Sequence, residues 1–339
     1  MFDTLKTLCE LNGTSGREHA VREYIIEQIK DYAGYSVDKL GNIIAFKRGK
    51  EVPKNKIMLD AHMDEVGLIV TSVQSDGTLT FAEVGGVDPS VVIGRQVKIN
   101  GLYGVVGAKA VHNLSADEKE NAPEMDSLYI DIGAADKEEA EKHVRLGDCA
   151  YFASEYVDLG NDTIKAKAID DRFGCALLID MIKSELKYDM HFTFSVQEEI
   201  GLRGARTAAY TINPDIAIVV ETTTAADIDC VAPKKQVCHL GKGAVIPFMD
   251  RSTMYDKELY DMAFELAKEK NIPCQTKTTI AGGNNSGAIH TARSGIKTIA
   301  VSAPCRYLHS PSCIADKHDL KACYDIINAI IEKAAVMDL

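Results

Sequence analysis

The chain contains no tryptophan, and aromatic residues make up only 6% of its 339 residues. Its nine cysteines are scattered, and none of them forms a C-x-x-C pair. An odd number of scattered cysteines argues against a disulfide framework and against a structural zinc knuckle. Thiols that need no pairing are typical of a reducing compartment, so we expect the protein in the cytosol.

Long apolar runs and basic clusters are also missing. No apolar stretch approaches the roughly 20 residues that a membrane-spanning helix needs, so no membrane is expected as a partner. The first 30 residues mix charged and apolar side chains and contain no small-residue cleavage site, which is unlike a secretory signal. The formal net charge is -12, and basic residues occur only in short pairs such as Lys234 and Lys235. Nucleic acid is therefore not an expected partner, because its binding depends on a basic surface.

The composition that remains is that of an ordinary folded protein. Hydrophobic residues make up 46% of the chain and charged residues 26%, values typical of soluble globular domains. The length exceeds the roughly 250 to 300 residues over which a single hydrophobic core usually grows. We therefore expect one large domain with a smaller partner.

The outer parts of the chain and its middle part show two different sequence patterns. In the outer parts, residues 1–66 and 159–339, apolar strands alternate with segments of helical periodicity. Strands are expected at 56–61, 190–196, 216–220 and 298–302, helices at 1–30, 171–187, 256–271 and 319–335, and a β-hairpin at 35–47 around Gly41-Asn42. Buried strands without polar alternation predict an α/β fold whose mostly parallel sheet has helices on both faces.

The middle part, residues 67–158, is rich in short β segments separated by glycine and proline. Strands are expected at 68–73, 78–84, 96–99, 103–107, 128–132 and 150–152, and one helix at 136–143. This pattern predicts a small β-barrel-like or sandwich-like domain. It would be inserted between the two parts, 1–66 and 159–339, of the larger α/β domain.

Histidines and carboxylates recur where the apolar strands of the inferred sheet end. The residues concerned are His62 with Asp64, Asp170 with Asp171, Glu198 with Glu199, Glu221, and His309. Ligand sites of open α/β sheets gather at the carboxyl ends of the strands. We therefore expect these side chains to lie close together.

Several of these positions have a specific chemical reading. His62 and Asp64 point the same way on an extended strand, so the carboxylate can hold the imidazole while the imidazole binds a metal ion. Asp170 follows an apolar strand, and Asp171 can cap the helix after it. Of the adjacent Glu198 and Glu199, one could bind metal while the other accepts a proton from a metal-bound water.

Each position also has an ordinary explanation when it is taken alone. Asp171 beside Arg172 is often only a cap and a surface ion pair, and a buried Glu221 could pair with an arginine or lysine instead of a cation. His309, in a segment bounded by Pro304 and Pro311, could be structural. Together, however, two histidines and several carboxylates form a ligand set that suits zinc.

Four motifs give this ligand set a family context. They are HMDEVG at 62–67, IDDRFG at 169–174, QEEIGLRGA at 197–205 and RYLHSP at 306–311. In this order and at these separations, the chain resembles the tetrahedral (TET) and glutamyl aminopeptidases, dinuclear metallopeptidases that were sometimes mislabelled as endoglucanases. The likeness covers essentially the whole chain, including GVVGAKAVH and LYIDIGA in the middle part.

The resemblance implies a role for each residue of the site. Asp170 would bridge two divalent cations, zinc or alternatively cobalt or manganese, and Glu198 would be the general base. The remaining assignments are His62, Glu221, Glu199 and His309 as further metal ligands, and Asp64 as the group that orients His62. The implied fold is a phosphorylase/hydrolase-like α/β domain with a PDZ-like β-barrel insertion, assembled from dimers into a homododecamer that acts on short peptides with a free N-terminus.

The chain departs from the family pattern at two places. Glu221 stands where the family more commonly has aspartate; the charge is kept, so we expect metal binding with altered geometry. The loop Gly282–Gly287 reads GGNNSG where relatives often have Gly-Gly-Thr-Asp, a change that bears on substrate preference. Gly283, Asn284 and Arg251 are candidates for the lining of the substrate pocket.

Two other functions compete with a peptidase. A glycoside hydrolase needs only two carboxylates, but such enzymes usually line their clefts with aromatic residues, and His62 and His309 would be unexplained. A metal-binding assembly protein without turnover is the second alternative. It would have no use for the spare base Glu198.

Overall fold

Apolar segments without polar alternation form the centre of an eight-stranded sheet. The computed structural model describes residues 1–339, except for the side chain of residue 117. In spatial order the strands are β1 (Gly34–Val37), β2 (Ile43–Lys47), β12 (Met190–Ser195), β3 (Ile57–His62), β13 (Ile216–Thr224), β16 (Lys297–Cys305), β14 (Ala244–Ile246) and β15 (Cys274–Thr276). The central strands β12, β3, β13 and β16 run parallel, which confirms the mostly parallel sheet.

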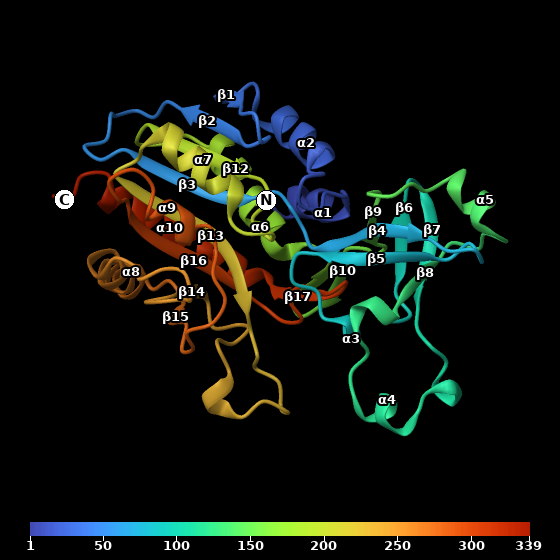
Figure 1. Cartoon of the computed structure of the whole chain (residues 1–339). Helices are drawn as coiled ribbons and strands as arrows, with labels where there is room; N and C mark the ends of the chain where they lie inside the picture. Colours follow the sequence, from blue (N-terminus) through green and yellow to red (C-terminus); the bar gives the residue numbers. More distant parts are fainter.

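Helices cover both faces of this sheet, as predicted (Figure 1). On one face the core is shared by α1 (Phe2–Glu10), α2 (His19–Ile29), α6 (Ile169–Lys183), α8 (Lys257–Lys270) and α10 (Lys317–Ala334). The other face carries α7 (Arg203–Ile212) and α9 (Ser286–Ile289), which pack on a separate apolar cluster. The sheet is therefore buried on both sides, which explains its continuous apolar strands.

The middle part of the chain folds into a closed six-stranded barrel beside the main sheet (Figure 1). In order around the barrel, its strands are β4 (Gly67–Val73), β5 (Leu79–Val84), β8 (Tyr129–Asp131), β7 (Leu102–Gly107), β6 (Gln96–Ile99) and β9 (Cys149–Phe152). Short helices α3 (Pro89–Val92), α4 (Ala116–Glu120) and α5 (Lys137–Glu141) lie between strands. The barrel has its own apolar core, so the predicted β-barrel is confirmed.

A third, smaller sheet connects the barrel segment to the α/β part and was not predicted. Its antiparallel strands are β10 (Val157–Gly160), β11 (Thr163–Ala166) and β17 (Cys313–Asp316). β10 and β11 follow the barrel, whereas β17 comes from the far end of the sequence. This sheet places the start of α6 beside the segment that follows β16.

The first 30 residues form two helices, α1 and α2, so the prediction of one continuous helix was wrong. Backbone groups at the end of α1 and in the segment after it bind the buried charges of Glu65 and Arg172. The N–H of Gly13 donates to Glu65 at 2.9 Å, and the Arg172 guanidinium donates to the carbonyls of Leu8 and Leu11 at 2.6 and 3.3 Å. Gly16 ends this turn with a φ of +80°, which favours glycine.

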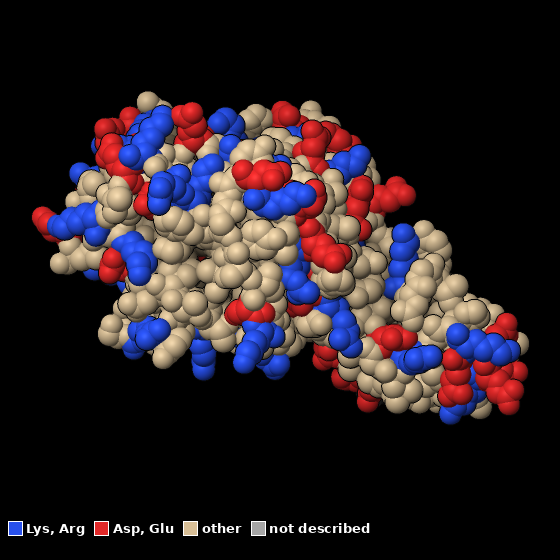
Figure 2. All heavy atoms as spheres, turned by 90° about the horizontal axis from the view of Figure 1, so that it is seen from above, with Lys and Arg blue, Asp and Glu red and all other residues tan. Residues whose placement is uncertain are grey.

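Charge is mixed on the surface. On the face drawn in Figure 2, basic and acidic side chains alternate, and no single large basic area is visible among the residues shown. Within the described part of the chain, no helix is both long and apolar enough to cross a membrane.

The contact between α7 and the β1–β2 hairpin generates a test of the packing. A Cβ on Gly204 would lie 2.3 Å from Asn42 Oδ1 and 2.4 Å from the carbonyl oxygen of Val196. We expect Gly204→Ala to lower the free energy of unfolding by about 1 to 3 kcal/mol, because the backbone neighbour cannot move aside. Urea denaturation followed by circular dichroism measures this change.

Gly34→Ala is the matched control, because the nearest atom to its added Cβ would be 4.0 Å away. This exposed position should change the unfolding free energy by less than about 0.5 kcal/mol. Equal denaturation midpoints for the two variants would contradict the proposed close packing at Gly204.

Candidate metal centre

The five predicted metal ligands meet at one edge of the main sheet. His62 Nε2 lies 3.3 Å from Asp170 Oδ1 and 3.9 Å from Glu221 Oε2. His309 Nε2 lies 3.4 Å from Asp170 Oδ2 and 3.3 Å from Glu199 Oε2. The two oxygens of Asp170 therefore face different histidines, and each histidine has a further carboxylate of its own.

The elements that supply these side chains differ in part from the prediction of five strand ends in one sheet. His62 ends β3, and Glu199 follows β12, as predicted. Glu221 lies inside β13, because this strand stays paired with β16 as far as Thr224. Asp170 follows β11 of the small sheet, and His309 lies in the loop between β16 and β17.

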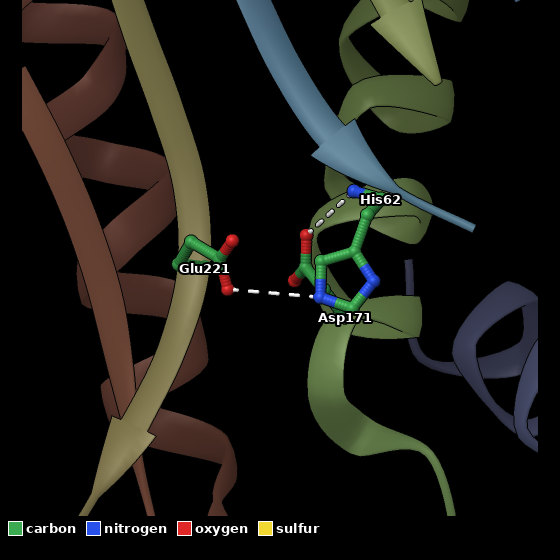
Figure 3. A group of neighbouring side chains, drawn as sticks. All are labelled: His62, Asp171 and Glu221. Atoms are coloured by element: carbon green, nitrogen blue, oxygen red, sulfur yellow. Dashed lines mark hydrogen bonds and ion pairs between the residues drawn. The ribbon is translucent and has the colours of Figure 1, made fainter. Parts of the chain in front are cut away.

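Asp171 lies beside this cluster but has a different use. His62, Asp171 and Glu221 have potential ligand atoms within 4.8 Å of one another, and so do His62, Asp170 and Glu199. Figure 3 shows, however, that the Asp171 carboxylate accepts the backbone N–H of His62, at 3.2 Å. Its other oxygen accepts the N–H of Gly174 at 2.9 Å, consistent with the predicted cap. Asp170, whose oxygens face the two imidazoles, is therefore the better candidate ligand.

The chemistry of the cluster fits divalent cations. Asp170 Oδ1 and Glu221 Oε1 are buried and have no hydrogen-bond partner among the described residues. A buried carboxylate oxygen without a partner is costly, and a cation removes that cost. Imidazole and carboxylate groups are the donors that zinc, cobalt and manganese accept in proteins.

The ionisation of the cluster reflects its strong negative potential. Burial alone would lower the pKa of both histidines. Glu221, Asp170 and Asp64 nevertheless raise the pKa of His62 well above its usual value, and Asp170 and Glu199 raise that of His309 to about 10. Burial raises the pKa of Glu198 to about 7. The same field that holds protons on the imidazoles attracts metal cations.

Asp64 has a role that the sequence did not indicate. Its carboxylate accepts the backbone N–H groups of Glu198 and Glu199 at 3.0 and 3.1 Å, and the hydroxyl of Ser15 at 2.6 Å. His62 Nδ1 lies 3.0 Å from the backbone carbonyl oxygen of Asp64 but 3.5 Å from the carboxylate. Asp64 thus orients His62 mainly through its carbonyl, while its side chain positions both glutamates.

A buried ion cluster beneath the site holds two of its motifs together. Glu65 receives Lys167 Nζ at 2.7 Å on both carboxylate oxygens, and Arg172 Nη2 lies 3.4 Å from it. Arg172 Nε also donates to the carbonyl of Met63 at 2.8 Å. The interpretation of Arg172 as part of a surface ion pair was wrong, because this side chain is 0% exposed. The only sequence signal that Arg172 is not an ordinary surface residue was its place inside the IDDRFG motif.

The barrel also contributes to the centre. His309 Nδ1 lies 2.9 Å from the carbonyl oxygen of Gly86, in the loop that follows β5. When His309 Nδ1 donates its proton to this carbonyl, His309 Nε2 remains available to face Asp170 and Glu199. Gln197, Tyr307 and His309 adopt positive φ angles, which are strained for residues with a side chain. The geometry at the centre is thus imposed by the surrounding packing.

A cavity of about 550 Å³ opens over the centre. Gly283 and Asn284, two of the predicted substrate-binding residues, line it. Arg251 is not among the described lining residues; its backbone N–H instead donates to the carbonyl of Gly282 at 2.9 Å. Sequence reasoning missed Lys277, which lines this cavity and follows β15 outside any motif.

Two imidazoles and several carboxylates at the edge of an α/β sheet fit a metal-dependent hydrolase. The family model "M42 glutamyl aminopeptidase" matches residues 41–326, and the chain belongs to this family. A lysyl aminopeptidase of Pyrococcus furiosus is 33% identical over 99% of this chain and 98% of its own length.

Solved structures give the same relationship. A TET aminopeptidase of a marine sediment thaumarchaeon has a TM-score of 0.93 and 32% identity, covering 98% of this chain and 96% of its own. The TET1 peptidase of Pyrococcus horikoshii, described as assembling into a tetrahedron or a large octahedral shell, has a TM-score of 0.85 and 35% identity, covering 97% and 98%. Family and relatives together support an aminopeptidase activity and imply divalent metals.

The buried cluster around Glu65 yields a stability prediction. We expect Arg172→Met to lower the free energy of unfolding by about 3 to 5 kcal/mol, because one partner of a buried charge network is lost. Thermal and urea denaturation measure the loss. Arg206→Met, at an exposed position of α7, is the control and should leave the stability nearly unchanged. Similar losses in both variants would contradict a structural role for Arg172.

Proposed function

We propose that this protein removes N-terminal residues from short peptides with the help of two divalent cations. Zinc is the first candidate, and cobalt and manganese are the alternatives. The main support is Asp170, whose two oxygens face His62 and His309 at 3.3 and 3.4 Å. One carboxylate shared between two histidines divides the ligands into two sets that meet at a common bridge.

Each set would hold one cation. His62 and Glu221 would form the first with Asp170, and His309 and Glu199 would form the second with the other oxygen of Asp170. Cations bound there would lower the pKa of a water molecule and polarise the scissile carbonyl group. Glu221 keeps the charge of the commoner aspartate, and its unpaired Oε1 supports its use as a ligand.

Glu198 is the proposed general base. It lines the cavity, and it makes none of the close contacts with the histidines that mark the ligands. Its carboxylate would accept a proton from the attacking water and then donate it to the leaving amine nitrogen. Asp64 supports this role because it fixes the backbone N–H of both Glu198 and Glu199.

The remaining proposals concern assembly and location. Residues 67–158 are proposed as an assembly domain, and residues 1–66 and 159–339 as the catalytic domain. The relative from Pyrococcus horikoshii can assemble into a tetrahedron or a large octahedral shell, and a further similar structure is described as a dodecamer, which supports a homododecamer. We propose dimers as its building units. Tyr103 and Val111 of the barrel segment, 55% and 70% exposed, offer apolar surface for such contacts. We propose a cytosolic location, where the nine cysteines would stay reduced.

The competing functions have less support. A glycoside hydrolase would leave His62 and His309, which lie against these carboxylates, without a purpose. A silent metal-binding protein would not need Glu198 in a cavity above the ligands.

The division between ligands and base can be tested directly. Glu198→Gln should keep its metal content and lose activity on aminoacyl p-nitroanilides by about 10²- to 10⁴-fold, because only proton transfer is removed. His62→Ala should lose both metal and activity. Elemental analysis after dialysis, combined with kinetics, measures both properties. Full activity of Glu198→Gln, or a full metal content in His62→Ala, would refute these assignments.

A further inference from the structure

One wall of the cavity above the centre is the glycine-rich loop of residues 282–287. Gly282, Gly283 and Asn284 of this loop line the cavity. The next residue, Asn285, is 0% exposed and is not among the described lining residues. The side chain of Asn285 therefore contacts the interior of the protein and not a substrate.

Asn285 joins this loop to two strands of the main sheet. Its Nδ2 donates to Asp60 Oδ2 at 2.7 Å and to Ser195 Oγ at 2.8 Å. Asp60 lies in β3, two residues before the proposed ligand His62. Ser195 ends β12, three residues before the proposed base Glu198. One buried amide thus connects a wall of the cavity to the strands that lead to a ligand and to the base.

The groups around this amide determine that it must be a donor. Asp60 is 0% exposed, and a carboxylate without a proton only accepts hydrogen bonds. The Thr193 hydroxyl donates to its other oxygen. Asn285 Oδ1 is buried without a hydrogen-bond partner among the described residues, so the amide is oriented to bring its NH2 group to Asp60. A carboxylate at position 285 would instead place like charges together in a buried site, which is unfavourable.

The other contacts of the loop lead to a different part of the chain. Asn284 Nδ2 donates to the Tyr255 hydroxyl at 3.0 Å, and this hydroxyl donates to Asp250 at 2.6 Å. A Cβ on Gly283 would lie 2.7 Å from Ser252 Oγ, so the loop also packs closely on that residue. These contacts hold the loop to residues 250–255, whereas Asn285 holds it to the strands of the metal centre.

We propose that Asn285 is a positioning residue that sets the glycine-rich loop relative to the metal ligands and so shapes the substrate cavity. It acts through Asp60 and Ser195, to which its NH2 group donates at the same time. The inference rests on the proposed aminopeptidase function, because it concerns how the cavity receives a peptide.

Two single substitutions remove this link in different ways. Asn285→Ala deletes the donor without adding charge, and Asn285→Asp adds a second carboxylate beside Asp60. We expect each to raise KM for leucine p-nitroanilide by about 5- to 10-fold, the effect of one lost hydrogen bond on the position of the loop. Because the ligands and the base are unchanged, kcat should fall by less than about threefold and the metal content should stay at the wild-type value. Steady-state kinetics and elemental analysis measure these properties.

Exchanging the two side chains tests the direction of the hydrogen bond. In the double variant Asp60→Asn with Asn285→Asp, the donor moves to β3 and the acceptor moves to the loop. We expect KM of this variant within about threefold of the wild-type value, although Asn285→Asp alone raises it. Thermal midpoints give a readout without turnover, and the double variant should be more stable than Asn285→Asp. Asn161→Asp, in the exposed turn between β10 and β11, adds the same charge and should change neither KM nor the midpoint.

An unchanged KM in Asn285→Ala would overturn the proposal. A joint loss of kcat and metal content in that variant would also do so, because Asn285 would then support the metal centre as a whole. A double variant that is no better than Asn285→Asp, or that does not fold, would contradict the exchange. If Asn285→Asp itself does not fold, Asn285→Ala and the double variant decide the question.

Failure of the proposed function would look different. In that case the wild-type protein with added zinc, cobalt or manganese would not cleave leucine p-nitroanilide or other aminoacyl p-nitroanilides.

Discussion

The concentration of negative charge at the edge of the main sheet is the constraint on which the rest of the structure depends. Asp170, Glu198, Glu199 and Glu221 share one buried region with only two histidines between them. Carboxylates brought so close repel one another and lose their hydration, so this arrangement opposes folding unless cations compensate it. The negative electrostatic field that makes this region locally unstable also attracts metal cations.

The surrounding fold holds the charged groups against that repulsion. Asp64 fixes the backbone of the two adjacent glutamates, and Asn42 Oδ1 accepts the N–H of Val196 just before them, at 2.9 Å. The ion cluster around Glu65 joins α1 and the segment after it to the segments that carry His62 and Asp170. The barrel adds the contact between Gly86 and His309. The centre is therefore assembled from elements that are far apart in the sequence.

Much of this architecture could be predicted, because its signals are local. Buried strands such as Ile57–His62 lack polar alternation, and the barrel strands are separated by glycine. Four of the five proposed ligands were recognisable from their residue types within the four motifs, and Glu221 from its place in a buried apolar strand. The break between α1 and α2, the burial of Arg172 and the small sheet of β10, β11 and β17 were not, because each depends on partners distant in the sequence. Lys277 carries no motif, and only the fold places it in the cavity.

The central claim is that Asp170 is shared by two cation sites, and anomalous X-ray diffraction from crystals grown with zinc tests it most directly. The account predicts two anomalous peaks, one on each side of the Asp170 carboxylate. The first should lie beside His62 and Glu221, and the second beside His309 and Glu199. A single peak, or peaks that do not contact Asp170, would contradict it.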